Sequence, residues 1–258
     1  MGDAARAIDR ITVTPRFTAD DAARLNAQFE GVPVPEMLRA LIAHGLIGRA
    51  AVVSSFGAES AVLLHLIAQV NPDLPVLFLN TGKIFPETIA YRDLLIERLG
   101  LTDVRTITPD VDAIEKQDST GLRWSYDPDG CCELRKVIPL ETALAEFDTS
   151  ISGRKGFQSK TRAHLQRFEI EKGWLKVNPL AEWGKPELDA YFEAHDLPRH
   201  PLEAQGYLSI GCAPCTSVVK PGEDPRAGRW RGWEKVECGI HGEPITRPDD
   251  NPANDPVF

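Results

Sequence analysis

The chain has 258 residues, five cysteines and a net charge of −9, from 38 acidic and 29 basic side chains. A chain of this length can bury a core without disulfide bonds, and 42% hydrophobic and 26% charged residues exclude wholesale disorder. No apolar run reaches the roughly 18 residues of a transmembrane helix, and the N-terminus is charged where a secretory signal would be apolar. We therefore expect a cytoplasmic protein that binds neither membranes nor, given its acidity, nucleic acid.

Residues 1–48 are predicted to form an accessory helical segment, in which the apolar side chains of 35–46 recur at helical spacing. Short apolar strands and helices then alternate along the chain. We predict strands at 51–53, 75–79, 104–107 and 149–152, and helices at 61–69, 87–99, 111–116 and 133–147. Regular alternation of this kind indicates an α/β fold with a parallel, twisted sheet that is covered by helices on both faces.

The end of the chain differs in composition. The segment after Lys220 is rich in proline and glycine and shows neither helical nor strand periodicity, which is typical of irregular, mobile chain. We therefore expect one α/β domain over 1–216, followed by a flexible C-terminal arm over 217–258.

Two polar turns follow neighbouring predicted strands. The first runs from Ser54 to Ser60 and contains Gly57, which is expected to permit a tight turn. Its backbone N–H groups and serine hydroxyls, together with the N-terminus of the next helix, can surround a phosphate. The alternative is that Ser60 merely caps that helix. The second turn, residues 80–83, also contains a glycine, and the two together indicate a nucleotide site at the carboxyl ends of the strands.

Four of the five cysteines form two close pairs, Cys131-Cys132 and the Cys-x-x-Cys turn of Cys212 and Cys215. Structural zinc, disulfides or an iron–sulfur cluster would each account for two such pairs. Adjacent cysteines suit a single zinc ion poorly, and disulfides conflict with a reducing compartment. Ligation by four cysteines is ordinary for a 4Fe–4S cluster, which we therefore favour.

Two further residues are interpreted from their positions. Lys136 lies four residues after Cys132, so a helix would bring it to the same face, beside an anionic thiolate cluster. Cys238 stands apart on the predicted arm, where an accessible thiol could act as a nucleophile. The alternatives are an exposed surface lysine and an inert spare thiol.

Basic residues are concentrated despite the negative net charge. Residues 154–176 contain seven Lys or Arg against two acids, and Arg226, Arg229 and Arg231 precede Cys238. Arginine suits phosphate and sulfate oxygens. A solvated basic face or a nucleic-acid site would give the same run, but the nearby phosphate loop and nucleophile favour a small polyanion.

These motifs together resemble those of the assimilatory adenylyl-sulfate reductases, the iron–sulfur branch of the phosphoadenylyl-sulfate reductase family. The resemblance covers about residues 50–241, and its most specific parts are the two cysteine pairs and the motif from Glu237 to His241. It implies thioredoxin-dependent reduction of adenosine 5′-phosphosulfate to sulfite and AMP, on an adenine-nucleotide α-hydrolase-like fold. The family's Leu-Arg-Arg-x-Gln stretch reads Arg154-Lys155-Gly156-Phe157-Gln158 here, so neither Arg154 nor Lys155 is given a contact.

The resemblance also implies roles for individual residues. Cys238 matches the nucleophile, and the cluster ligands match Cys131, Cys132, Cys212 and Cys215. The residues that match the phosphosulfate site are Lys136, Arg162, Arg226, Arg229 and His241. The nucleotide loop matches Ser54, Gly57 and Ser60, and the strand end that meets adenine matches Leu79.

Three alternatives stay open at this point. The substrate could carry an additional 3′-phosphate, as for the phosphoadenylyl-sulfate reductases. A tRNA-thiolating protein could use the same loop and cluster, although it would need a larger basic surface. A zinc-stapled binding module would need no catalysis. The sequence does not indicate an oligomeric state.

Overall fold

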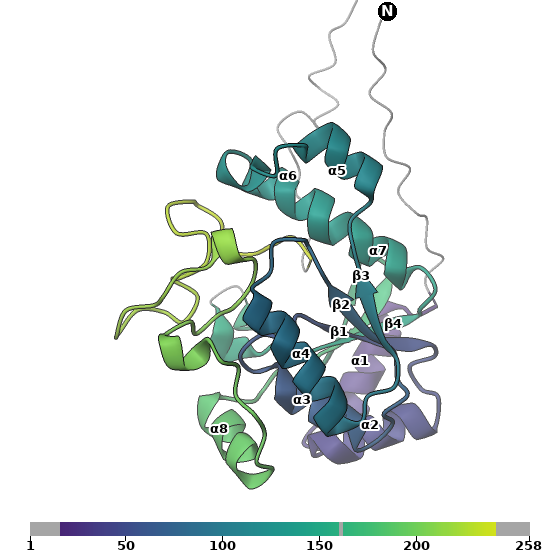
Figure 1. Cartoon of the computed structure of the whole chain (residues 1–258). Helices are drawn as coiled ribbons and strands as arrows, with labels where there is room; N and C mark the ends of the chain where they lie inside the picture. The colour runs from purple at the N-terminus through teal and green to yellow at the C-terminus, as the bar shows by residue number, and fades with distance from the viewer. Residues whose placement is uncertain (1–15, 160–161, 241–258) are drawn as a thin grey trace, which may run out of the picture.

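The computed structural model describes residues 16–159 and 162–240 (Figure 1). Its strands are β1 Ala50–Ser54, β2 Val76–Leu79, β3 Val104–Ile107, β4 Thr149–Ser152, β5 Phe168–Glu171 and β6 Trp174–Val177. Its α-helices are α1 Ala19–Gln28, α2 Val34–Ala43, α3 Ser60–Ala68, α4 Pro86–Leu99, α5 Val111–Asp118, α6 Pro128–Cys132, α7 Ile138–Leu144 and α8 Lys185–Ala194. Within the described ranges, no helix has both the length and the apolar character needed to cross a bilayer.

The strands form one six-stranded sheet in the order β3-β2-β1-β4-β6-β5. All neighbouring pairs are parallel except β5 and β6, which form an antiparallel pair at one edge. The four predicted strands are confirmed, and so is the predicted α/β class. The order places β1 in the interior of the sheet, so that its carboxyl end at Ser54 opens between the ends of β2 and β4.

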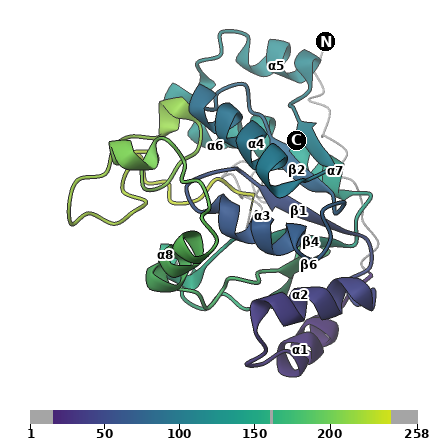
Figure 2. The same ribbon diagram turned by 60° about the horizontal axis from the view of Figure 1, so that its bottom comes forward.

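Alternating side chains along the strands pack into two apolar layers. On one face Val52, Val76 and Phe78 belong to a core with residues of α1 to α4 and α8. On the other face Ala51 and Leu77 pack with residues of α7. Helices therefore cover both faces of the sheet, as Figure 2 shows. Burial on both faces explains why the central strands are nearly continuous apolar runs.

The hairpin of β5 and β6 was not predicted from the sequence. Its residues lie in the basic tract 154–176, where charged residues interrupt the apolar pattern. Lys172 and Gly173 both have positive φ, 52° and 87°, at the connection between the two strands. Successive positive φ values match the twist of a tight hairpin, so the Lys-Gly pair was the local signal.

The helix predicted at 133–147 is also different in the structure. It begins earlier, at Pro128, and passes through a π-helical turn, η2 Glu133–Val137, before α7. Pro139 lies in the first turn of α7 and has no N–H to donate to the preceding turn. The wider π-helical turn accommodates this missing hydrogen bond without ending the helix. π-Helical turns are frequent at functional sites.

The arm has no helix or strand in its described part, residues 217–240. It leaves the short 3₁₀ turn η6 Ala213–Cys215 in a wide loop and returns toward the body of the molecule (Figure 1). A single bridge pairs Thr216 with Arg229, and Val219 and Trp230 are buried. The irregular backbone predicted for this segment is confirmed for the described residues.

Candidate active site

The first polar turn leaves β1 at Ser54. The buried Ser54 hydroxyl accepts a hydrogen bond from the Phe56 N–H at 3.2 Å. Gly57 is predicted to permit the tight turn, but the residue with positive φ is Phe56 (48°). Burial of the Phe56 ring, edge-on against Phe78, holds this uncommon conformation. Ser60 starts α3 without capping it, because the cap position is Glu59.

The second polar turn follows Leu79 at the end of β2. Gly82 adopts a φ of 71°, and the Asn80 side chain accepts its N–H at 3.0 Å. The Thr81 side chain is buried, and its hydroxyl lies 3.1 Å from the Cys212 sulfur. Backbone pairing of Ile84 with Cys212 reinforces this contact. The second polar turn therefore contacts Cys212 of the second cysteine pair, although Thr81 and Cys212 are 131 positions apart in the sequence.

The two cysteine pairs face one small cavity. Its lining consists of thiols, basic side chains and two tryptophans, namely Cys131, Cys132, Cys212, Cys215, Lys83, Arg135, Lys136, Trp124 and Trp230, together with Pro128. Three of the thiols are buried and the Cys215 thiol is partly buried. Among the described residues, no three or more His, Cys, Asp or Glu side chains are grouped so as to hold a metal ion. The two cysteine pairs, which were predicted to form one site, nevertheless line the same cavity.

The thiols influence one another. Burial, reinforced by the Cys212 charge, raises the pKa of Cys131 to about 11. Burial likewise raises the pKa of Cys132 to about 11, although Lys136 opposes the shift. Burial also acts on Cys212, but the Lys136 ammonium and neighbouring polar groups outweigh it and lower the Cys212 pKa. A set of thiols this close becomes anionic only with a counter-charge.

Lys136 supplies that charge from the π-helical turn. Its side chain is buried, which by itself disfavours an ammonium, yet the negative charges of Cys212, Cys238 and Cys132 hold its pKa above the ordinary value. The sequence-based alternative of an exposed surface lysine is therefore wrong. Because the π-helical turn carries Lys136 directly after the Cys131-Cys132 pair, the helix delivers thiols and counter-ion to one place.

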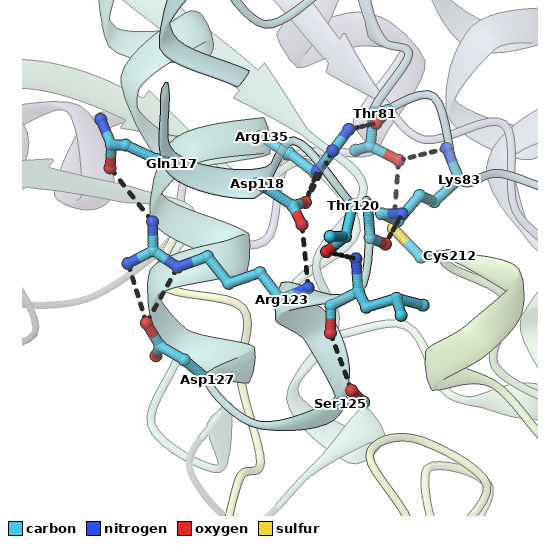
Figure 3. Close-up of polar contacts among 12 residues, drawn as sticks. Thr81, Lys83, Gln117, Asp118, Thr120, Arg123, Ser125, Asp127, Arg135 and Cys212 are labelled. Carbon is cyan, nitrogen blue, oxygen red and sulfur yellow. Dashed lines mark hydrogen bonds and ion pairs between the residues drawn. The ribbon is translucent and has the colours of Figure 1, made fainter. Parts of the chain in front are cut away.

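A buried ion pair joins helix α5 to the π-helical turn that follows the first cysteine pair, as Figure 3 shows. Arg135, on the turn that follows Cys132, pairs with Asp118 at 2.7 Å. Its other amino group donates to the Thr81 carbonyl at 2.9 Å, and Thr81 in turn contacts Cys212. The Asp118 carboxylate also accepts the Arg123 N–H at 2.9 Å. This network was not predicted, because its members lie on separate elements.

The arm brings Cys238 to the same region. The thiol is partly exposed and lies close enough to Cys132, Lys136 and Arg226 for its charge to act on them. Upstream on the arm, Arg229 stacks on Trp230, with the guanidinium carbon 4.4 Å from the ring centroid. The buried Arg229 Nε has no hydrogen-bond partner among the described residues. The structure thus gathers Cys238 with three of the predicted phosphosulfate-site cations.

The remaining predicted site residues lie on other segments of the chain. Ser54, Gly57 and Ser60 form the turn after β1, and Leu79 ends β2, so both meet at the carboxyl ends of the strands. Arg162 follows the 3₁₀ turn η3 Gly156–Gln158. His241 lies outside the described residues.

Much of the predicted anion-binding tract is structural. Arg154, Lys155 and Lys176 are buried and paired with Glu169, Glu59 and Glu171, respectively. Arg231 is exposed and pairs with Glu223 at 2.9 Å. Buried charges need partners, so a count of basic residues in the sequence overstates what is available to a ligand. The prediction that this local basic excess marks the position of a small polyanion therefore does not hold for Arg154, Lys155 and Lys176, although Arg154 and Lys155 had been given no individual contact.

Two glutamates were missed although they lie inside recognised motifs. Glu59, in the first turn, accepts hydrogen bonds from Lys155 and Gln158, both at 2.9 Å. Glu237, directly before Cys238, pairs with Arg162 at 2.9 Å. The available signal was a carboxylate inside a motif predicted to bind an anion. Such a carboxylate would repel the anion unless a basic side chain neutralised it, so a partner could have been expected.

The fold and this cluster of thiols and cations at the strand ends define a nucleotide-binding α/β protein with cysteine chemistry. Residues 49–218 match the model of the phosphoadenosine phosphosulfate reductase domain, and the chain belongs to this family. The adenosine 5′-phosphosulfate reductase of Mesorhizobium japonicum is 45% identical over 92% of this chain and 93% of that protein. A phosphoadenosine 5′-phosphosulfate reductase of Gloeobacter violaceus is 38% identical over 80% and 88%. The fold is also that of the phosphoadenylyl-sulfate reductase of Candida auris (TM-score 0.67, 23% identity, 80% of this chain and 100% of that one).

Proposed function

We propose that this chain reduces adenosine 5′-phosphosulfate to sulfite and AMP in sulfate assimilation, with thioredoxin as electron donor in the cytoplasm. The observation that carries the proposal is the position of Cys238. The arm sets this partly exposed thiol beside the Lys136 and Arg226 cations, at the strand ends where an α/β fold binds nucleotides. Membership of the family and the identity to relatives with this activity support the same conclusion.

In the first step, the Cys238 thiolate attacks the sulfur of the bound phosphosulfate. A bond forms between Sγ and the sulfo group, and the bond from that sulfur to the bridging oxygen breaks with its electron pair leaving on AMP. Lys136, Arg226 and Arg229, with His241 as a further candidate, hold the charge that develops on the departing phosphate. The product is a Cys238 S-sulfonate. Ser54, Gly57 and Ser60 hold the nucleotide, with Leu79 against the adenine.

In the second step, a thiolate of thioredoxin attacks Cys238 Sγ. Sulfite leaves with the electron pair of the sulfur–sulfur bond, and a mixed disulfide remains. The second thiol of thioredoxin resolves that disulfide, so the two electrons come from the thioredoxin dithiol. Cys238 must meet the substrate first and thioredoxin afterwards, which requires a mobile arm over 217–258 beside the domain formed by 1–216.

A 4Fe–4S cluster is the group that we propose for Cys131, Cys132, Cys212 and Cys215, because a cluster is larger than a single metal ion and its four ligands lie correspondingly farther apart. The four thiols line one cavity, and Lys136 provides the charge that an anionic thiolate set needs. A cluster bound there would supply structural support and negative charge, since thiols alone carry the electrons of the reaction. Iron and acid-labile sulfide analysis of anaerobically purified protein distinguishes it from a zinc site.

Replacement of the nucleophile tests the function. Cys238→Ser should abolish sulfite release and the mass increase of the S-sulfonate, because a hydroxyl at this position is a far weaker nucleophile at neutral pH. Iron and sulfide content should equal those of the wild type, because Cys238 is not one of the four proposed ligands. Mass spectrometry after one turnover without thioredoxin reads the intermediate directly. Retained turnover in the variant would contradict the assignment.

The identity of the nucleotide needs a separate comparison. Wild-type protein should turn over adenosine 5′-phosphosulfate with the higher kcat/KM when it is offered with and without the 3′-phosphate. The opposite preference would assign the chain to the second activity represented among its relatives.

A further inference from the structure

The carboxylate next to Cys238 occupies one full edge of a predicted substrate-binding arginine. Arg162 Nε and Nη2 donate to the two oxygens of Glu237, each at 2.9 Å. The two side chains are only 12% and 21% exposed, so water does little to screen the pair. A bidentate pair of this kind fixes orientation as well as distance.

A second guanidinium holds the same stretch of the arm. Arg226 Nη2 donates to a Glu237 oxygen at 3.1 Å and to the Val236 carbonyl at 2.9 Å. Glu237 therefore neutralises two cations at once. The two residues that Arg226 contacts, Val236 and Glu237, directly precede Cys238.

Arg162 is itself fixed from behind by the first polar turn. Its Nη1 donates to the Gln158 side-chain oxygen at 2.8 Å, and the Gln158 amide donates to Glu59 at 2.9 Å. The buried Lys155 ammonium donates to the same carboxylate at 2.9 Å. A continuous set of polar contacts thus runs from Glu59 in the first polar turn to Glu237, the residue before Cys238.

We propose that Glu237 is a positioning residue, which docks the arm on Arg162 and Arg226 and so holds Cys238 in line with the substrate. On this view Arg162 acts on the arm through Glu237, and not on the substrate phosphate as the resemblance implies. The physical reason is that Glu237 takes the Nε–Nη2 edge of Arg162 and Gln158 accepts from Nη1, so that the protein itself engages three of the five N–H donors of this guanidinium. The inference rests on the proposed reductase function.

The test uses Glu237→Gln in anaerobically purified holoenzyme. Loss of the charge should slow S-sulfonate formation in a single turnover by about tenfold or more, because a displaced nucleophile loses its attack geometry. The Kd for AMP should change by less than about twofold, since the carboxylate is not a phosphate ligand. Alkylation of Cys238 by iodoacetamide, followed on its peptide by mass spectrometry, should become faster because the arm opens.

Two further variants make the assignment specific. Arg162→Gln should reproduce the slow sulfonation with an unchanged Kd for AMP, and the double variant should lose no more than the worse single variant. Glu237→Asp keeps the charge and should recover part of the rate, and it serves in place of Glu237→Gln if that variant does not fold. Glu234→Gln, at an exposed position of the same arm, is the matched control and should behave as wild type.

Weaker AMP binding by Arg162→Gln, or losses that multiply in the double variant, would overturn the proposal. So would an unchanged alkylation rate in Glu237→Gln. Failure of the proposed function is distinguishable, because wild-type protein would then form no S-sulfonate from adenosine 5′-phosphosulfate, whereas alkylation would still report on the arm.

Discussion

At the scale of single residues, the site is supported by a buried ion pair, Asp118 with Arg135, whose members are not among the proposed substrate-binding residues. Asp118 is fully buried at its side chain and Arg135 is 9% exposed. Between them they connect helix α5, the π-helical turn and the Thr81 turn. Removal of one charge from such a pair leaves the other buried without compensation, which costs more than the pair contributes when intact.

We therefore expect Asp118→Asn to lower the free energy of unfolding by about 3 kcal/mol. For a chain of this size, that loss corresponds to a fall in Tm of roughly 10 °C. Thermal denaturation followed by circular dichroism measures it. Glu115→Gln, at an exposed position of the same helix, is the control and should stay within about 0.5 kcal/mol of wild type. Equal melting temperatures for both variants would show that the Asp118–Arg135 pair carries no stability.

At the scale of elements, the Cys-x-x-Cys turn and the arm that follows it pack against each other at the site. The Trp230 N–H donates to the Cys215 carbonyl at 3.1 Å, so the arm lies directly on the Cys-x-x-Cys turn. Gly211, immediately before Cys212, lies under the guanidinium of Arg229. A Cβ at this position would overlap the end of the Arg229 side chain. Glycine is therefore required here for close approach and not for backbone conformation.

Gly211→Ala should displace Arg229 without unfolding the protein, because the atoms in its way end a flexible side chain. We expect kcat to fall about tenfold or more, since a cation near the developing phosphate charge is moved. The Tm should change little. Arg229→Ala provides the comparison: the double variant should be no slower than Arg229→Ala alone. A further loss in the double variant would mean that Gly211 acts by another route.

At the scale of the whole molecule, the charge is distributed very unevenly. A chain with net charge −9 gathers Lys136, Arg162, Arg226 and Arg229 near one end of its sheet. Thiols and Glu237 compensate these cations from within the site. The acidity elsewhere does not prevent anion binding, because exposed charges beyond about 10 Å are largely screened at moderate salt.

How much could be predicted depended on the range of the interactions involved. The strands β1 to β4 follow from local apolar runs between helices, and the predicted bounds of β3 and β4 agree with the structure. The hairpin of β5 and β6 was missed because charged residues interrupt its apolar pattern, and the ion pairs that these residues form become visible only in the folded chain. The π-helical turn was missed because the sequence signal for it is small. Pro139, in the first turn of α7, lacks one backbone N–H and leaves the apolar helical pattern unchanged.

Residue types and their spacing were enough to predict the α/β class, the two turns at the strand ends, and the division of five cysteines into two pairs and one more. These features depend on residue type and spacing over short stretches, which a sequence displays directly. The folded chain was needed to see that Arg154, Lys155 and Lys176 are paired internally, that Thr81 contacts Cys212, and that Glu237 occupies one edge of Arg162. The reason is that a charge or hydrogen-bonding group acts on whatever lies within a few ångströms, and folding chooses those neighbours from any part of the chain.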